Sequence, residues 1–156
     1  MSYAAHATWG EFYADERLKP MLRAARTTLS ADTVSDIKRV VKRCRAGVFD
    51  DGDSPARLHG DLWNGNLMWT ADGVVLIDPA AHGGHRETDI AMLHLFGCPH
   101  LGAVVQGYEE AHPLAPGWTD RMPLHQLYPL LAHVVLFGAG YAHQTHQAAR
   151  KVLAMA

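Results

Sequence analysis

The sequence contains only two cysteines, Cys44 and Cys98, among its 156 residues. A small fold held together by several disulfides is therefore excluded, and we expect both cysteines to be reduced thiols. The sequence also lacks a long hydrophobic run. Its longest apolar stretch, from Leu130 to Ala142, contains His133 and falls short of the ~20 residues that cross a bilayer. We expect this stretch to form a helix of the protein core.

An excess of one charge is also absent. Lys and Arg residues number 14 against 16 Asp and Glu residues, which gives a formal net charge of −2. This balance offers no electrostatic reason to expect nucleic acid or an anionic membrane as a partner. Charged side chains interrupt the first twenty residues, which therefore do not read as a secretory signal. We predict a cytoplasmic location.

What the sequence does contain is a dense polar motif, Leu58-His59-Gly60-Asp61-Leu62-Trp63-Asn64-Gly65-Asn66, with Leu76-Ile77-Asp78-Pro79 after it. An aspartate five residues before an asparagine can approach a substrate hydroxyl while the asparagine oxygen reaches a metal ion. A second aspartate, at the end of the next strand, can bind the same ion. The spacing predicts a kinase catalytic loop at 58–66, with Asp61 as the catalytic residue and Asn66 and Asp78 holding Mg²⁺ and, through it, ATP.

The alternative for Asp61 is a turn residue that binds nearby backbone amides, which is common for an aspartate beside a glycine. The matching offsets of Asn66 and Asp78 favour the functional interpretation. Eleven histidines also raise the possibility of a zinc site, since His82 and His85 are three residues apart, as are His143 and His146. No carboxylate or cysteine completes either pair at a familiar spacing, so we do not predict zinc.

The period of the apolar residues predicts the elements around the motif. Asn66 to Thr70 and Val74 to Asp78 read as two strands joined by a turn at 71–73, which makes 66–79 a metal-binding hairpin. A helix capped by Thr8 and kinked at Pro20 is expected before residue 30, and a second, capped by Ser30 or Asp32, up to residue 45. The remainder, 86–155, reads as helical, with breaks at Pro99, 113–117, Pro123 and Gly138. With 48% apolar residues the chain can build one core, and we predict a single domain over 1–156.

The motif resembles that of the fructosamine kinase family, as does the segment Gly84-His85-Arg86-Glu87-Thr88-Asp89-Ile90-Ala91. Stretches at 95–97, 107–109 and 126–141 are similar to the C-terminal helices of that family, and the segment from Trp9 to Leu18 resembles the helix that opens its large lobe. The resemblance implies a mainly α fold with a small β-hairpin (α+β), the C-terminal lobe of a protein-kinase-like fold that the aminoglycoside phosphotransferases share. It implies transfer of the γ-phosphoryl group of ATP to a hydroxyl of a ketoamine sugar, such as a fructosamine.

The resemblance also assigns roles to residues around the loop. Asp89, with His59, would support the catalytic loop, as an acid on the helix after the metal site does in the kinase fold; alternatively, Asp89 compensates charge in the first helical turn. Arg86 and Glu87 would border the acceptor site, or form an ordinary surface pair. Trp63 would stack on a sugar face, or pack the loop against the helices.

No glycine-rich loop and no strand lysine can be read in the sequence, and only eight residues precede Trp9. By the resemblance, the small N-terminal lobe that covers ATP is absent from this chain. We expect exposed apolar surface where that lobe would dock, with self-association or a partner chain there. Two alternatives remain open: a phosphotransferase acting on aminoglycosides or another small molecule, and a non-catalytic kinase lobe that serves as a binding module.

Overall fold

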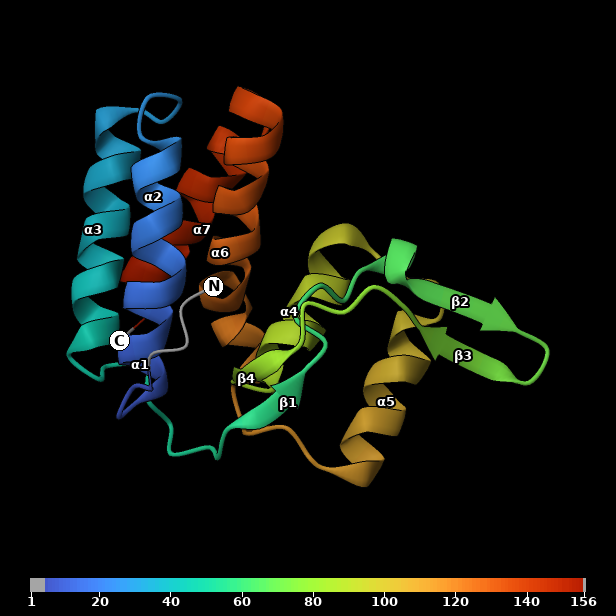
Figure 1. Ribbon diagram of the computed structural model, residues 1–156. Helices are drawn as coiled ribbons and strands as arrows, with labels where there is room; N and C mark the ends of the chain where they lie inside the picture. Colours follow the sequence, from blue (N-terminus) through green and yellow to red (C-terminus); the bar gives the residue numbers. More distant parts are fainter. Residues whose placement is uncertain (1–4, 156) are drawn as a thin grey trace. The chain divides into compact units, whose positions relative to one another are not determined.

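The computed structural model of the chain describes residues 5–155. These residues form mainly helices, with two small antiparallel sheets, so the predicted α+β class is confirmed (Figure 1). They group into two compact units: one combines the residues up to Asp53 with those from Gln126 onward, and the other runs from Ser54 to His125. That the whole chain acts as one domain stays a prediction.

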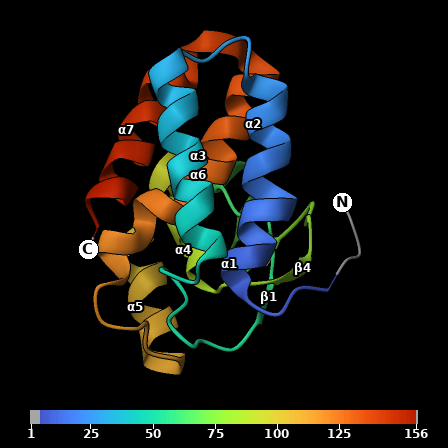
Figure 2. The ribbon, with the colours of Figure 1, turned by 90° about the vertical axis from the view of Figure 1, so that its left-hand side faces the viewer.

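The first unit is a helical bundle in which α3 lies beside α2 and α7 (Figure 2). Its elements are α1 (Trp9–Phe12), a π-helical segment (Tyr13–Leu18), α2 (Lys19–Ala25), α3 (Ala31–Arg45), the second half of α6 (Trp118–Phe137) and α7 (Ala142–Ala154). The two predicted N-caps are present. Thr8 Oγ1 accepts from the N–H of Glu11 at 3.2 Å, and Ser30 Oγ accepts from the N–H of Thr33 at 3.2 Å.

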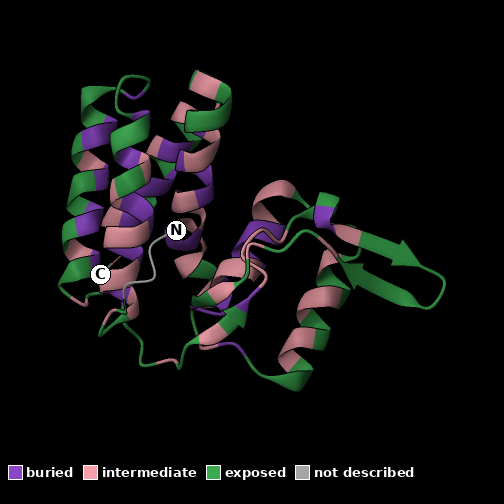
Figure 3. Cartoon of the chain, viewed as in Figure 1, coloured by how far each residue is buried: buried purple, intermediate pink, exposed green. Residues whose placement is uncertain are grey.

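The buried faces of these helices meet inside the bundle (Figure 3). Ile37 and Val40 of α3 and Val152 of α7 are fully buried. Arg43 of α3 donates to the carbonyl oxygens of Leu153 at 2.9 Å and Met155 at 2.7 Å. A cation therefore caps the carboxyl end of α7 and joins the two helices.

The second unit contains both sheets, and its elements are β1 (Ala56–Leu58), β2 (Leu67–Thr70), β3 (Gly73–Leu76), β4 (His82–Gly84), α4 (Glu87–Phe96), α5 (Leu101–Ala111) and the start of α6. The predicted hairpin is β2 paired with β3, in the register Leu67 with Leu76. The pairing of β1 with β4 was not predicted, because strands of three residues are too short to show an alternating pattern.

Helix α6 differs from the prediction in two ways. It runs through Pro123, so the predicted break there is wrong. Leu124 and Leu127, which follow the proline and are fully buried, stabilise the continued helix. The apolar stretch that begins at Leu130 is buried only at first, since Leu136 and Phe137 are 70% and 65% exposed. Among the described helices, none has the length and apolar character that a bilayer crossing requires.

Candidate active site

The motif at 58–66 lies between β1 and β2 and is held by a carboxylate from α4. Asp89 Oδ2 accepts from the N–H of His59 at 2.7 Å, and Asp89 Oδ1 accepts from the N–H of Gly60 at 3.0 Å. One side chain thus satisfies two successive backbone donors just before Asp61. Asp89 makes the contacts that the resemblance implies for it.

His59 joins the loop to the segment that leads into Asp78. Its Nε2 lies 2.9 Å from the carbonyl oxygen of Ile77, and its Nδ1 lies 3.3 Å from the backbone nitrogen of Asp61. A carbonyl oxygen only accepts and a backbone N–H only donates, so these partners fit a neutral imidazole with its proton on Nε2. The ring therefore fixes the spacing between the Asp61 backbone and the chain beside Asp78.

Asn66 turns its amide nitrogen toward Asp61. Asn66 Nδ2 donates to the carbonyl oxygen of Asp61 at 2.7 Å and to its Oδ2 at 3.0 Å, and the Asn66 side chain is buried. Because the amide nitrogen is used in this way, the amide oxygen is the Asn66 atom suited to a cation. The hydrogen bonds also hold the Asp61 carboxylate, which is partly exposed, in a fixed direction.

The hairpin brings the residue before Asp78 into backbone contact with Asn66. The N–H of Ile77 donates to the carbonyl oxygen of Asn66 at 3.1 Å, one step beyond the last β2–β3 pair. Asp78 is exposed and has φ of 49°, in the left-handed region that a non-glycine residue rarely adopts. Such backbone strain is concentrated at functional positions in proteins.

Two glycines make the close approaches in the loop possible. Gly60 has φ of 81°, and a Cβ there would overlap the carbonyl oxygen of Ala80. A Cβ on Gly65 would overlap the indole ring of Trp63, which lies against the Gly65 backbone. The indole is still 42% exposed, so one part of the ring packs on the loop while another part remains open.

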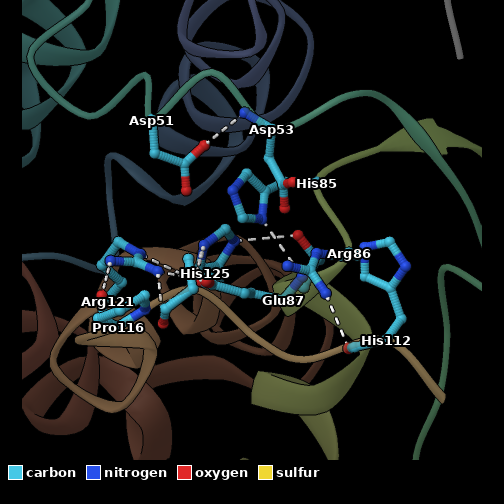
Figure 4. A network of polar contacts seen from close by, with 11 residues as sticks. Asp51, Asp53, His85, Arg86, Glu87, His112, Pro116, Arg121 and His125 are labelled. Atoms are coloured by element: carbon cyan, nitrogen blue, oxygen red, sulfur yellow. Dashed lines mark hydrogen bonds and ion pairs between the residues drawn. The ribbon is translucent and has the colours of Figure 1, made fainter. Parts of the chain in front are cut away.

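Arg86 and Glu87 do not form a surface pair, since they are only 9% and 2% exposed. Arg86 Nη1 donates to the carbonyl oxygen of His112 at 3.1 Å. Glu87 lies between two side chains of α6: Arg121 Nε donates to its Oε2 at 3.0 Å while Arg121 Nη2 donates to Oε1, and His125 Nε2 lies 3.4 Å from Oε2 (Figure 4). A substrate contact by Arg86 or Glu87 stays a prediction, and their burial argues against it.

The ionisation of this cluster follows from its contacts. Burial alone would raise the pKa of Glu87, but the hydrogen bonds from His125 and Arg121 outweigh it and lower this pKa to about 2. Burial lowers the pKa of His125, so its imidazole is neutral at pH 7. Its Nδ1 lies 3.0 Å from the hydroxyl oxygen of Thr88, which can donate to it. The cluster therefore holds one carboxylate and one guanidinium in a buried ion pair.

Sequence analysis missed Arg121 and His125, which follow Glu87 by more than thirty residues and stand in no motif. It also found no carboxylate to complete a metal set with His85. In the described part of the chain, donor atoms of His85, Glu87 and His125 do lie within 4.8 Å of one another. His85 Nδ1 accepts from the N–H of Glu87 at 3.2 Å, so this ring caps the start of α4.

The chain is similar to known proteins over nearly all of its length. The family model described as fructosamine kinase matches residues 3–155. A protein of Vibrio parahaemolyticus named "probable ketoamine kinase" is 38% identical over 149 residues, which cover 95% of this chain and 50% of that protein. A protein of the same description from Synechocystis is 38% identical over 147 residues, covering 94% and 49%. The chain therefore spans about half the length of these relatives.

Solved structures give the same result. The crystal structure of a protein assigned as a fructosamine-3-kinase from Thermobifida fusca superposes with a TM-score of 0.92 at 51% identity, covering 98% of this chain and 54% of that one. A protein with the same assignment from Haemophilus somnus gives a TM-score of 0.81 at 25% identity, covering 97% and 52%. The fold described above is thus shared with experimentally determined structures.

Proposed function

The chain belongs to the fructosamine kinase family, and from this premise we propose that it carries the catalytic residues of an ATP-dependent kinase acting on a hydroxyl of a ketoamine sugar. One observation carries the proposal. Asn66 donates a hydrogen bond to the Asp61 carboxylate, and Ile77, the residue before Asp78, makes a backbone contact with Asn66. These contacts support a role for Asp61 as the acid–base residue and for Asn66 and Asp78 as metal ligands in phosphoryl transfer.

We assign the chain to the large C-terminal lobe of a protein-kinase-like fold. Support comes from the order of its parts, in which a loop at 58–66 precedes the hairpin, and the hairpin precedes helices α4 to α7. In this assignment, Asp89 on α4 is the residue that organises the catalytic loop. The match to about half of each relative agrees with one lobe of a two-lobed protein.

In the proposed reaction Asp61 accepts a hydrogen bond from the acceptor hydroxyl, orients its oxygen toward the γ-phosphorus of ATP and can take its proton. The residues fit Mg²⁺, because the carboxylate of Asp78 and the amide oxygen of Asn66 are the hard oxygen ligands that this ion prefers. When bound, Mg²⁺ would neutralise negative charge on the phosphates. The hydrogen bond from Asn66 Nδ2 to Asp61 fixes the position of the base, Asp61, relative to the metal ligand, Asn66.

Trp63 is an exposed aromatic residue close to Asp61 in the sequence. Trp63 lies two residues after Asp61, its indole is fixed against Gly65, and 42% of the residue remains exposed. An indole in this position can stack on the apolar face of a sugar, which would place a sugar hydroxyl near Asp61. We therefore keep Trp63 as a substrate residue, and the burial of Arg86 and Glu87 argues against a direct substrate contact by either.

A protein partner is also part of the proposal. The hairpin of β2 and β3 exposes apolar side chains on both faces, among them Met68, Val75 and Leu76 at 51%, 49% and 53%. Exposed apolar surface of this kind favours association. We propose that a second polypeptide surface, from a further copy of the chain or from another chain, covers the hairpin.

A direct test grafts this chain in place of the matching segment of the Thermobifida fusca protein and compares the chimera with the chain alone. ATP consumption by the chimera should depend on fructoselysine and remain at background with kanamycin. Stimulation by kanamycin alone would favour the aminoglycoside phosphotransferase alternative. Folded protein that consumes no ATP with either acceptor, while Mg²⁺ and nucleotide still bind, would favour the non-catalytic binding module.

A further inference from the structure

Two residues in the first turn of α4, Glu87 and Asp89, anchor the helix on two sides. Asp89 accepts from the backbone N–H groups of His59 and Gly60 in the catalytic loop. Glu87 accepts from Arg121 and His125 at the start of α6. We propose that Glu87 is a positioning residue, whose buried ion pair fixes the start of α4 so that Asp89 can hold the catalytic loop.

The geometry of the turn makes this coupling direct. Each residue of a helix is rotated by ~100° from the one before it, so side chains two residues apart point in directions about 160° apart. Glu87 and Asp89 therefore make their contacts on opposite sides of α4. A rotation of the turn that loosened one contact would strain the other. Thr88, between them, adds a third contact through the hydrogen bond of its hydroxyl group with His125 Nδ1 at 3.0 Å. Three consecutive side chains thus define the orientation of the turn.

Burial makes the anchor specific. Glu87 and His125 are 2% and 1% exposed, and an isolated carboxylate there would be strongly disfavoured. Arg121 supplies the balancing charge in a two-pronged contact that involves both oxygens of Glu87. Because the charge is stable only in this one arrangement, the ion pair selects one position of α4 rather than simply adding stability.

A metal ion is the competing occupant of this cluster, since His85, Glu87 and His125 offer three donor atoms close together. The charge of the cluster argues against a bound metal ion. Zinc would add two positive charges to a buried site in which the Arg121 guanidinium already neutralises Glu87. His85 Nδ1 and both Glu87 oxygens moreover accept hydrogen bonds from protein donors. The cluster is therefore complete as an ion pair.

The test is hydrogen exchange at single amides, read by NMR on the 156-residue chain. The inference rests on the proposed function only in naming the loop catalytic, and exchange is measurable whether or not the chain is active. Glu87→Gln should speed exchange at the His59 and Gly60 amides by about tenfold or more beyond any acceleration that the other slow amides of 54–125 share. The matched control Glu110→Gln, at an exposed position of α5, should change neither amide.

A double mutant separates positioning from general stability. Asp89→Asn removes one of the two acceptors and should itself speed exchange at His59 and Gly60. If Glu87 acts through Asp89, the Glu87→Gln/Asp89→Asn protein should exchange there no faster than the faster single variant. Exchange rates that multiply, or an equal acceleration of all amides in 54–125 by Glu87→Gln, would overturn the proposal.

Two further arms cover other outcomes. If Glu87→Gln does not fold, Arg121→Lys keeps a cation but cannot span both carboxylate oxygens, and should give the same local acceleration with a smaller amplitude. Its failure to change the two amides would overturn the proposal. Titration of the wild-type chain with zinc alone should show no stoichiometric binding at the cluster. Binding that His85→Ala abolishes would replace the ion-pair assignment with a metal site.

Discussion

The buried Glu87 carboxylate should make the stability of residues 54–125 fall steeply in acid. Its pKa is about 2 in the folded chain against 4.5 for an ordinary glutamate. Because the folded-state pKa is depressed, the stabilisation is fully present above pH 4.5 and is lost as the pH falls toward 2. A difference of this size corresponds to about 3 kcal/mol in total, of which about 2 kcal/mol is lost by pH 3.

The comparison that isolates this contribution is wild type against Glu87→Gln, which has no titrating group at this position. Between pH 6 and pH 3 the stability difference between the two proteins should shrink by about 2 kcal/mol, because only the wild type loses the carboxylate. The neutral His125 of the folded state also lowers stability below about pH 6.5, as the unfolded imidazole takes up a proton. The Asp15 pKa, lowered by the hydrogen bond from Lys19, acts in the same direction in both proteins.

Urea unfolding followed by tryptophan fluorescence is the assay, since Trp63, Trp69 and Trp118 lie in the unit that contains Glu87. The exposed-site control Glu110→Gln should follow the wild-type curve throughout. Curves for wild type and Glu87→Gln that stay parallel from pH 6 to pH 3 would refute the reasoning, because Glu87 would then have an ordinary pKa.

Three other perturbations test separate parts of the structure. Asp78→Ala should abolish Mg²⁺-dependent nucleotide binding by calorimetry, since Asn66 alone offers a single neutral oxygen, whereas Asp72→Ala in the turn of the same hairpin should not; unchanged Mg²⁺ affinity would remove Asp78 from the site. Arg43→Ala should cost about 1–2 kcal/mol in chemical unfolding through the lost cap on α7, and an equal loss on changing the exposed Lys42 would contradict this. Light scattering after size exclusion should show association of the wild-type chain that Val75→Lys reduces, and a monodisperse wild-type monomer would exclude self-association through the hairpin.

The contacts within the loop at 58–66 and the hairpin could be predicted from the sequence because they are local. Asp61 and Asn66 are five residues apart, and the turn at 71–73 returns the chain to place Ile77 beside Asn66. The N-caps at Thr8 and Ser30 were predictable for the same reason. Each of these features depends on residue types at short, fixed spacings.

Long-range features could not be read in this way. Glu87 meets Arg121 across 34 residues, and nothing in the intervening sequence marks either residue as the partner of the other. The family resemblance suggested that Glu87 borders the acceptor site, but its burial, which depends on the packing of the folded chain, places it inside the protein. The continuation of α6 through Pro123 likewise depends on the buried leucines that follow, which override a local preference.

The most direct test of the proposed activity measures phosphorylation of fructoselysine by ³¹P NMR, with the chain grafted into the Thermobifida fusca protein. The grafted wild type should convert ATP and fructoselysine to a sugar phosphate monoester and ADP. Asp61→Asn should lower this turnover by ~10²–10⁴ while the fold is retained, the loss expected for a positioned acid–base group. The control Asp72→Asn should leave turnover unchanged. Wild-type turnover in the Asp61→Asn protein would contradict the assignment of the catalytic residue and, with it, the central claim.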